Sequence, residues 1–171
     1  MKNCFKIFLF ALTTFMFSLS AKATHIVGGE IYYDSLGNNQ YKITFEIYRD
    51  CGPASSILQL PLQYRIFYGN GDLWGDFSIQ TAFSQDILPI VYDDPCVTPP
   101  DDICIQRYIL IDTVTLPFDI SGYHISYQVC CWANNIDNIT NPGDNGITLT
   151  TFIPGSALTD IHNQGARFIN Y

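Results

Sequence analysis

The feature that most constrains the fold of this chain is the strict alternation of apolar and polar residues in several short segments. In residues 41–47, Tyr, Ile, Phe and Ile alternate with Lys, Thr and Glu, and the same period recurs in residues 62–68 and 123–129. Successive side chains of an extended strand point to opposite faces, so a period of two residues predicts strands with one buried face. No segment shows helical periodicity. The sequence therefore predicts an all-β chain.

Five further segments are rich in β-branched and aromatic residues, which favour strands. They are residues 26–33, 77–81, 87–92, 106–116 and 147–153. Gly, Asn, Asp and Pro cluster between the segments and provide turns. About eight or nine strands without helices predict an antiparallel β-sandwich with disulfides, either immunoglobulin-like or jelly-roll, and the alternation does not choose between these two topologies.

The N-terminus has the three parts of a secretory signal peptide. Residues 1–6 are short and basic, residues 7–19 are almost wholly apolar, and Ala21-Lys22-Ala23 places small residues at the cleavage site. The apolar run is shorter than the roughly 20 residues that a membrane span requires. We therefore expect a signal peptide over residues 1–23, cleavage after Ala23, no later transmembrane segment, and a secreted or cell-surface protein.

Cleavage after Ala23 would leave residues 24–171, which are enough for a single domain with its own core. This part of the chain has five basic and sixteen acidic side chains, a net charge of about −11. Such a charge opposes binding to nucleic acid and favours solubility at an exposed surface. Residues 165–171 have the pattern of another extended segment, so the domain is also interpreted as the head of a longer polypeptide.

Cysteines are expected to pair in an exported chain, because it meets an oxidising environment. Five remain after signal removal: Cys51, Cys96, Cys104, Cys130 and Cys131. Cys51 and Cys131 are each in phase with the apolar face of their strand, which predicts a Cys51–Cys131 disulfide worth about 4 to 5 kcal/mol. Cys96 and Cys104 flank an Asp/Pro-rich loop and are predicted to close it. Cys130 is then the unpaired candidate, although Cys130 and Cys131 could exchange roles.

Two sequence features suggest catalysis. Residues 26–30, Ile-Val-Gly-Gly-Glu, are similar to the mature N-terminus of a trypsin-like protease, but the serine and histidine motifs of that enzyme are missing. His25 would be an N-terminal copper ligand if cleavage followed Thr24, with His124 or His162 as a second ligand. We therefore predict no catalytic residues and no enzyme activity. A secreted carbohydrate-binding or carbohydrate-active copper protein is the alternative.

Acidic loops give a hypothesis of calcium binding, because carboxylate and amide oxygens are the ligands that calcium prefers. The principal candidates are Asp93, Asp94, Asp101 and Asp102. Smaller groups are Asp72 with Asp76, and Asp137 with Asn141 and Asp144. None of these groups matches an ordered calcium loop, and Asp and Asn also form turns without an ion. No other cofactor is expected. Trp74, Trp132 and Tyr33 are candidates for stacking on sugar rings.

Five short phrases occur in a fixed order along the chain, at residues 24–30, 36–41, 47–51, 127–131 and 134–136. Together they resemble the N-terminal region of very large Bacteroidota surface proteins that carry PKD domains or gliding-motility-associated C-terminal domains. The resemblance implies an exported β-rich head followed by repeated domains and a C-terminal secretion signal. Many relatives have cysteine where this chain has Ser35, and the residues after the cysteine pair, Trp132-Ala133, also depart from the family pattern.

The resemblance also implies O-glycosylation at Asp-Ser/Thr-apolar triplets. Asp34-Ser35-Leu36 and Asp112-Thr113-Val114 fit this pattern, which makes Ser35 and Thr113 the predicted attachment sites. The family has no activity that can be assigned to particular residues. We therefore expect a non-catalytic cell-surface module with an adhesive or structural role, whose partner is a glycan, matrix or another surface protein.

Overall fold

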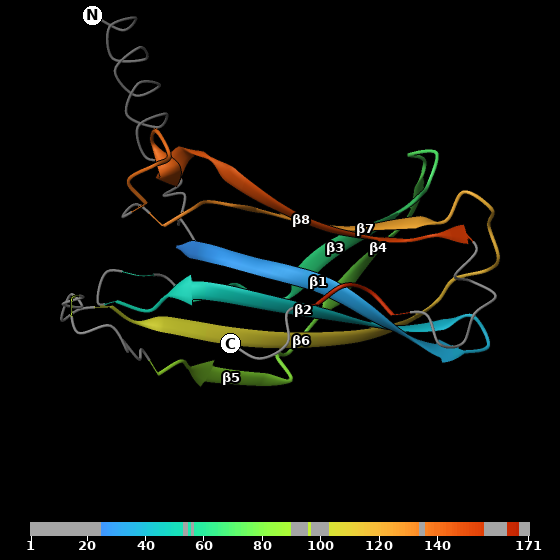
Figure 1. Ribbon diagram of the computed structural model, residues 1–171, viewed down its shortest axis with the longest axis horizontal. Coiled ribbons are helices and arrows are strands. Elements are labelled where there is room, and N and C mark those ends of the chain that lie inside the picture. Colours follow the sequence, from blue (N-terminus) through green and yellow to red (C-terminus); the bar gives the residue numbers. More distant parts are fainter. Residues whose placement is uncertain are drawn as a thin grey trace, which may run out of the picture.

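A computed structural model describes residues 25–52, 55, 57–89, 96, 103–133, 136–155 and 164–167. It contains eight β-strands and one short 3-10 turn, η1 (Pro142–Asp144) (Figure 1). The strands are β1 (Ile26–Gly37), β2 (Gln40–Asp50), β3 (Leu62–Tyr68), β4 (Leu73–Ile79), β5 (Ser84–Ile87), β6 (Ile105–Thr115), β7 (Tyr123–Cys130) and β8 (Gly146–Ile153).

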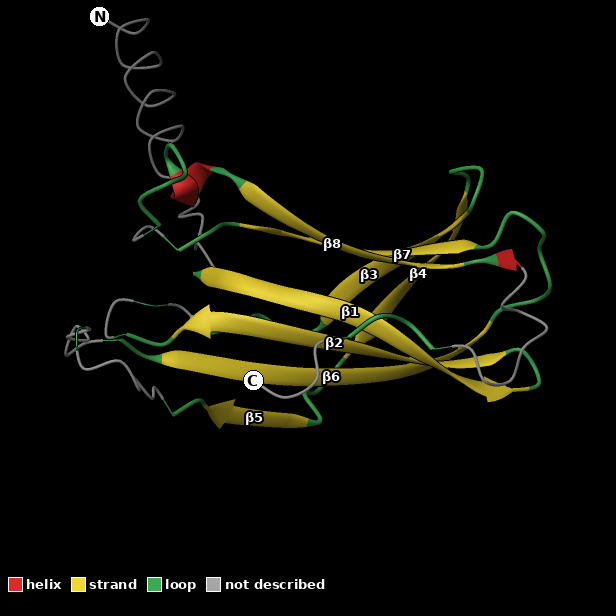
Figure 2. Cartoon of the chain, in the orientation of Figure 1, coloured by secondary structure: helices red, strands yellow, loops and turns green. Residues whose placement is uncertain are grey.

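The strands form two four-stranded antiparallel sheets that pack as a sandwich. The first sheet has the order β1-β2-β6-β5 and the second has the order β4-β3-β7-β8 (Figure 2). This confirms the predicted all-β sandwich. The order corresponds to strands A-B-E-D and C′-C-F-G of immunoglobulin-like sandwiches, so it matches the first of the two expected topologies.

The core lies between the sheets and contains the inward half of each alternating segment. Phe45, Leu110, Ile66 and Ile125 are fully buried there. The rings of Phe45 and Tyr64 lie with their centroids 4.8 Å apart. The hydroxyl of Tyr64 donates a hydrogen bond to Asp112 Oδ2 at 2.8 Å, across the sandwich. This bond gives the buried Tyr64 hydroxyl a partner, and without one its burial would lower the stability of the fold.

The connection from β6 to β7 crosses between the sheets and is anchored by a tyrosine. Tyr123 lies at the start of β7, is almost fully buried, and its hydroxyl donates a hydrogen bond to the carbonyl oxygen of Pro117 at 2.9 Å. The same contact, from a tyrosine early in strand F to backbone a few residues upstream, defines the tyrosine corner of immunoglobulin-like domains. Tyr123 thus fixes the corner at which the chain changes sheets.

Two strands differ from the sequence prediction. β4 begins at Leu73 rather than at residue 77, because a register shift beside Ile66 and Phe67 interrupts its alternation. β5 covers residues 84–87 instead of 87–92: residues 88–89 follow the strand, and residues 90–92 lie outside the described part. β5 is a mostly exposed edge strand held by pairing with β6, so it has no apolar period to detect.

The described C-terminal segment, residues 164–167, lies along the edge of β1. Gln164 forms a bridge with Asp34, and the backbone nitrogen of Gly165 donates to the carbonyl oxygen of Tyr33 at 2.7 Å. Arg167 reaches Asp34 at 3.3 Å and lies over the ring of Tyr32. Residues 165–167 of the segment expected to be extended run beside β1, but the bridge to β1 is formed by Gln164, just before them.

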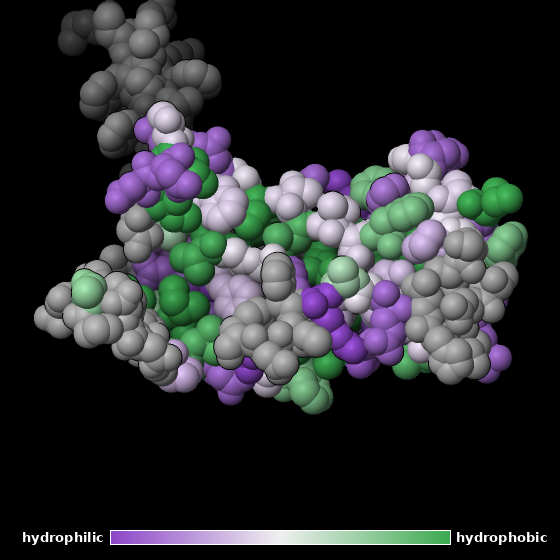
Figure 3. All heavy atoms as spheres, in the orientation of Figure 1, coloured by the Kyte–Doolittle hydropathy of each residue, from purple (hydrophilic) through white to green (hydrophobic). Residues whose placement is uncertain are grey.

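The described residues include no helix that is long and apolar enough to cross a membrane. On the face of the molecule seen in Figure 3, hydrophobic residues form separate islands among hydrophilic ones.

Candidate functional site

The outward surface of the second sheet, β4-β3-β7-β8, is called the open face here. Its residues alternate with the buried ones: Tyr64 and Ile66 of β3 point inward, whereas Gln63, Arg65 and Phe67 point outward. β7 follows the same rule, because Ile125 is buried and its neighbours His124 and Ser126 are on the other side. The polar half of each alternating segment therefore ends on one surface.

Strand register arranges the side chains of the open face in three rows that run across the strands. The aromatic row is Leu73, Phe67, His124 and Phe152; the central row is Asp76, Arg65, Ser126 and Thr150; the amide row is Ser78, Gln63, Gln128 and Thr148. The pairing of β3 with β7 ends at Arg65 and Ser126, so Gln63 and Gln128 face each other across the gap beyond the last pair, where both line the same depression. Residues from four strands thus meet in a two-dimensional array.

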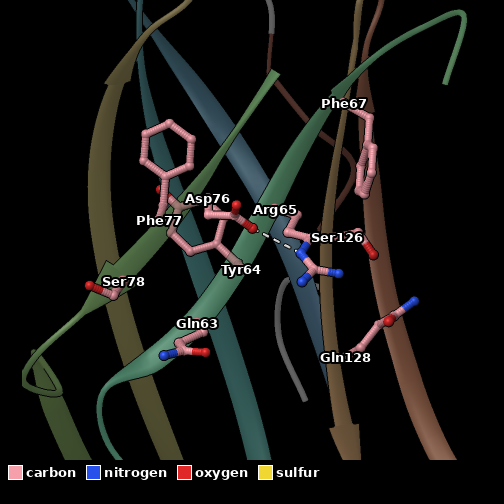
Figure 4. Close-up of a pocket in the computed structure, with 9 residues that line it drawn as sticks. All are labelled: Gln63, Tyr64, Arg65, Phe67, Asp76, Phe77, Ser78, Ser126 and Gln128. Carbon is pink, nitrogen blue, oxygen red and sulfur yellow. Dashed lines mark hydrogen bonds and ion pairs between the residues drawn. The ribbon is translucent and has the colours of Figure 1, made fainter. Parts of the chain in front are cut away.

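Three adjoining depressions mark this face. The largest has a volume of about 710 Å³ and is lined by residues of β3, β4 and β7, including Gln63, Arg65, Asp76 and Gln128 (Figure 4). A second, of about 470 Å³, lies beside residues 58–62, and a third, of about 370 Å³, lies between β7 and β8. Gln128 lines all three. We call the combined hollow the trough.

The outward-facing side chains of the largest depression are mostly polar, and their charges cancel. Arg65 Nε lies 2.8 Å from Asp76 Oδ1, and the two side chains are 61% and 65% exposed. Gln63 and Gln128 are exposed on either side of this ion pair (Figure 4). Amide side chains donate and accept hydrogen bonds, and the hydroxyl of Ser126 does both as well. The trough therefore presents neutral hydrogen-bonding groups around a cancelled pair of charges.

The aromatic row borders the central row. The rings of His124 and Phe152 lie with their centroids 4.4 Å apart and are inclined by 30°. Phe152 is 41% exposed, although it belongs to a strand of the sheet. Phe67 is paired with His124 and is partly buried. A strip of ring surface is thus available to a ligand that also contacts the polar rows.

The first sheet presents a different outward surface, which we call the closed face. Thr44 and Glu46 point outward from β2, yet they are only 3% and 6% exposed. Glu46 accepts a hydrogen bond from the Tyr48 hydroxyl at 3.1 Å and pairs with Arg107 at 3.3 Å. The charged groups at the centre of this face are therefore engaged with one another.

The predicted Cys51–Cys131 disulfide is wrong, because Cys51 is bonded to Cys104. The two residues continue the pairing of β2 with β6, directly beyond Asp50 and Ile105, with Cα atoms 5.0 Å apart. The backbone nitrogen of Cys51 also donates to the carbonyl oxygen of Cys104 at 2.9 Å. The bond staples two neighbouring strands of one sheet, whereas the phase argument assumed that it would join two sheets.

The predicted Cys96–Cys104 pair is wrong for the same reason, and Cys96 is exposed. Cys130 is not unpaired as predicted, because it is bonded to the adjacent Cys131. An exchange of roles between these two residues therefore does not occur either. Cys130 is at the end of β7 and lines the two smaller depressions of the trough. The sequence predicted which cysteines are near strands but not which strands are neighbours.

The calcium candidates Asp93, Asp94, Asp101 and Asp102 lie outside the described residues. Asp72 instead closes the β3–β4 turn, where its backbone nitrogen donates to Asn70 Oδ1 at 3.0 Å, while Asp76 pairs with Arg65. Over the part of the chain that the structure describes, no three His, Cys, Asp or Glu residues are grouped so that they could hold a metal ion.

The copper hypothesis required His25 and a second histidine to meet. His25 precedes β1, and its neighbour Ile26 is bridged to Trp132, eight residues beyond His124. Since extended chain rises about 3.4 Å per residue, His25 and His124 are at opposite ends of the sandwich. His162 lies outside the described residues. The geometry therefore does not bring His25 and His124 together.

The other predicted residues occupy ordinary structural positions. Ser35 is half-buried near the end of β1, and its hydroxyl accepts a weak hydrogen bond from the Gly37 backbone at 3.5 Å. Thr113 is exposed on β6. Both remain predicted glycosylation sites. Tyr33 is buried, and Trp74 and Trp132 pack against the core, so none of these three rings faces outward as a free platform.

Sequence reasoning missed the open face. The signal was present, because residues 63, 65 and 67 and residues 124, 126 and 128 occupy the outward phase of two predicted strands. The sequence did not show that these two strands are neighbours.

Comparisons with known proteins found no matching protein-family model, no matching curated protein and no matching solved structure.

Proposed function

We propose that this chain is an exported, non-catalytic binding module of the adhesion type, and that the trough is its ligand-contact surface. One observation carries the proposal: exposed amide and hydroxyl side chains, with partly buried aromatic ones, line three depressions that span four strands and meet at Gln128. Side chains placed on strands of a packed sandwich are held more rigidly than side chains on loops. A surface of this kind is suited to holding a ligand without remodelling.

The residues of the trough favour binding over catalysis. A catalytic site needs a nucleophile or general base aligned with a further group that activates or orients it. Here Arg65 and Asp76 are paired with each other, and His124 is stacked against Phe152. The groups that remain, Gln63, Gln128 and Ser126, are uncharged hydrogen-bonding residues without a neighbouring base in this array. They suit recognition of a ligand.

The cellular setting of the proposal comes from the sequence. The signal peptide over residues 1–23 supports export, and the resemblance to large Bacteroidota surface proteins supports display at the cell surface. A net charge of −8 for the whole chain also suits an exposed, soluble module. In that setting a rigid sandwich with one engaged face and one open face would present the open face to a partner.

The experiment is a binding array of glycans and surface polymers, probed with the secreted, oxidised protein and two matched variants. Gln128→Arg introduces bulk and charge at the centre of the trough, whereas Gln85→Arg makes the same change at an exposed position of β5 in the first sheet. We expect saturable binding that Gln128→Arg abolishes and Gln85→Arg retains. A folded protein that binds nothing on the array would overturn the proposal in favour of a structural spacer.

A further inference from the structure

We infer that the trough recognises a neutral polysaccharide chain, which crosses the strands along the central row, between the amide row on one side and the aromatic row on the other. This inference deepens the proposed function and depends on it. Size is the first argument: the largest depression alone has a volume of about 710 Å³, and the two others extend it across β7 to β8. Since pockets for whole small ligands measure about 300 to 1,000 Å³, the trough suits an oligosaccharide rather than one sugar.

Charge is the second argument. The ion pair of Arg65 and Asp76 cancels within the trough, and the whole chain has a net charge of −8. A polyanion, such as a uronic-acid or sulfated polymer, would approach a negative protein without a cluster of cations to receive it. A polycation would find one exposed carboxylate there, and that carboxylate is already paired. An uncharged ligand is not repelled by the negative protein and does not need a free charged partner in the trough.

Hydrogen-bonding capacity is the third argument. Sugar hydroxyls donate and accept, so they are best matched by groups that also do both. Gln63 and Gln128 have amides of this kind, and Ser126 and Thr150 add hydroxyls in the next row. The ring surfaces of His124 and Phe152 lie beside them and can cover the apolar C–H face of a sugar ring. The combination matches the two chemical sides of a polysaccharide.

Peptide ligands fit this surface less well. An extended peptide binds by adding a strand to a sheet edge, where backbone groups are unpaired. The trough is on the face of the sheet, where β3 is paired with β4, β7 is paired with β8, and β3 and β7 are paired as far as Arg65 and Ser126, so only a short stretch of backbone beyond that pair faces a gap. An amphipathic helix needs an apolar groove, and the amide and central rows are polar. The geometry therefore favours a glycan over a protein segment.

The test is calorimetric titration of the secreted, oxidised protein with neutral hexasaccharides, namely cello-, xylo-, manno- and laminari-hexaose, beside polygalacturonate and dextran sulfate. We expect at least one neutral hexasaccharide to bind, with little change in affinity when the salt concentration is raised. Gln128→Ala and Phe152→Ala should each weaken that binding about 3- to 10-fold, the usual range for a lost hydrogen bond or ring contact. Gln85→Ala, on the first sheet, should leave it unchanged.

Three outcomes would overturn the inference, and they differ in what they imply for the proposed function. Binding of the acidic polymers alone, lost at high salt and on Gln128→Ala, would mean that the trough is the site but the ligand is anionic. Absence of binding to every hexasaccharide, together with array or cell binding that depends on Gln128, would reject the ligand class and keep the binding module. Hexasaccharide binding that is insensitive to both Gln128→Ala and Phe152→Ala would show that the trough is not the binding site, and both proposals would then fail.

Discussion

The two outer faces of the sandwich both present polar residues, but these residues differ in how far they are exposed and paired. On the closed face, Glu46 is 6% exposed and is held by Tyr48 and Arg107. On the open face, Arg65 and Asp76 are more than half exposed and lie in a hollow lined by amides. On the first face the central charged groups are paired and shielded from solvent, whereas on the second the charged pair is exposed to solvent.

The difference teaches that net charge is a poor guide to where the hollow, accessible surface of this protein lies. The acidic composition directs attention to Asp-rich loops, yet several described carboxylates are occupied within the fold. Asp34 pairs with Lys42 at 2.9 Å and with Arg167 at 3.3 Å. Asp112 accepts a hydrogen bond from the Tyr64 hydroxyl. The surface that is hollow and accessible is the one built from neutral side chains.

The disulfides show the same contrast between the sheets. Cys51–Cys104 joins the two central strands of the first sheet across 53 residues of chain, whereas Cys130–Cys131 joins neighbours in sequence at the end of the second sheet. Replacing Cys51 and Cys104 with Ala should lower the free energy of unfolding by about 4 kcal/mol, because the unfolded chain regains the entropy of an open loop. Urea denaturation under oxidising conditions measures the loss.

The matched control replaces Cys130 and Cys131 with Ala. A bond between adjacent residues closes no long loop, so this variant should lose only about 1 kcal/mol, from packing around the half of the pair that is buried. Equal losses in the two double variants would contradict the view that the first sheet alone is stapled.

Alkaline pH should act mainly through the inner side of the second sheet. Burial raises the pKa of Tyr127 to about 12 from its ordinary value of 10.0, and burial, with Asp112 nearby, raises the pKa of Tyr64 as well. The folded state therefore keeps these protons when the unfolded state has lost them. For Tyr127, the stabilising effect is complete below pH 10 and is lost as the pH rises from about 10 to about 12.

For Tyr127 this loss amounts to about 2 to 3 kcal/mol, at 1.36 kcal/mol for each unit of pKa. Urea midpoints measured between pH 8 and 12 should fall less steeply for Tyr127→Phe than for the unmodified protein. Parallel curves for the two proteins would show that Tyr127 is ionised as easily in the folded state as in the unfolded one.

Glu46→Ala tests the closed face. The change leaves the guanidinium of Arg107, whose side chain is 30% exposed, without its main partner. We expect a loss of about 1 to 2 kcal/mol, between the values for exposed and fully buried ion pairs, because solvent screens part of the interaction. Thermal and urea unfolding measure it. A variant as stable as the parent would mean that Glu46 is a bystander on this face.

Arg65→Ala is the corresponding change on the open face and should have the smallest effect on stability. Arg65 and Asp76 are 61% and 65% exposed, so their pair should contribute less than about 1 kcal/mol to unfolding. The same urea series, run beside Glu46→Ala, gives the comparison directly. If Arg65→Ala proved more destabilising than Glu46→Ala, the distinction between an engaged face and an available face would fail.

Local pattern was sufficient to predict most of the fold. The alternation in residues 41–47, 62–68 and 123–129 correctly indicated strands, and the inward residues Phe45, Ile66 and Ile125 are in the core. It failed for β5, whose residues are mostly exposed, and for the start of β4, where a bulge interrupts the period. In both strands, pairing with a neighbour decides the structure, and the residues themselves carry little signal.

The candidate site was less predictable than the fold, for a related reason. The outward phase of residues 63–67 and 124–128 is visible in the sequence, but the trough exists only because β3 and β7 are adjacent in a fixed register. The cysteines show this equally well. The sequence indicated the face of the strand on which Cys51 lies, whereas its disulfide partner depended on which strand lies beside β2.

The sequence by itself determined which side chains share a face, because the direction of a side chain in a strand follows from the local backbone and repeats every two residues. Only the tertiary structure decided which faces meet, which strands are neighbours and which cysteines bond. Those outcomes depend on contacts between residues far apart in the chain, such as Cys51 with Cys104 and Arg65 with Ser126. Such contacts form when strands that are distant in the chain pair with each other, and a local sequence pattern does not indicate which strands will pair.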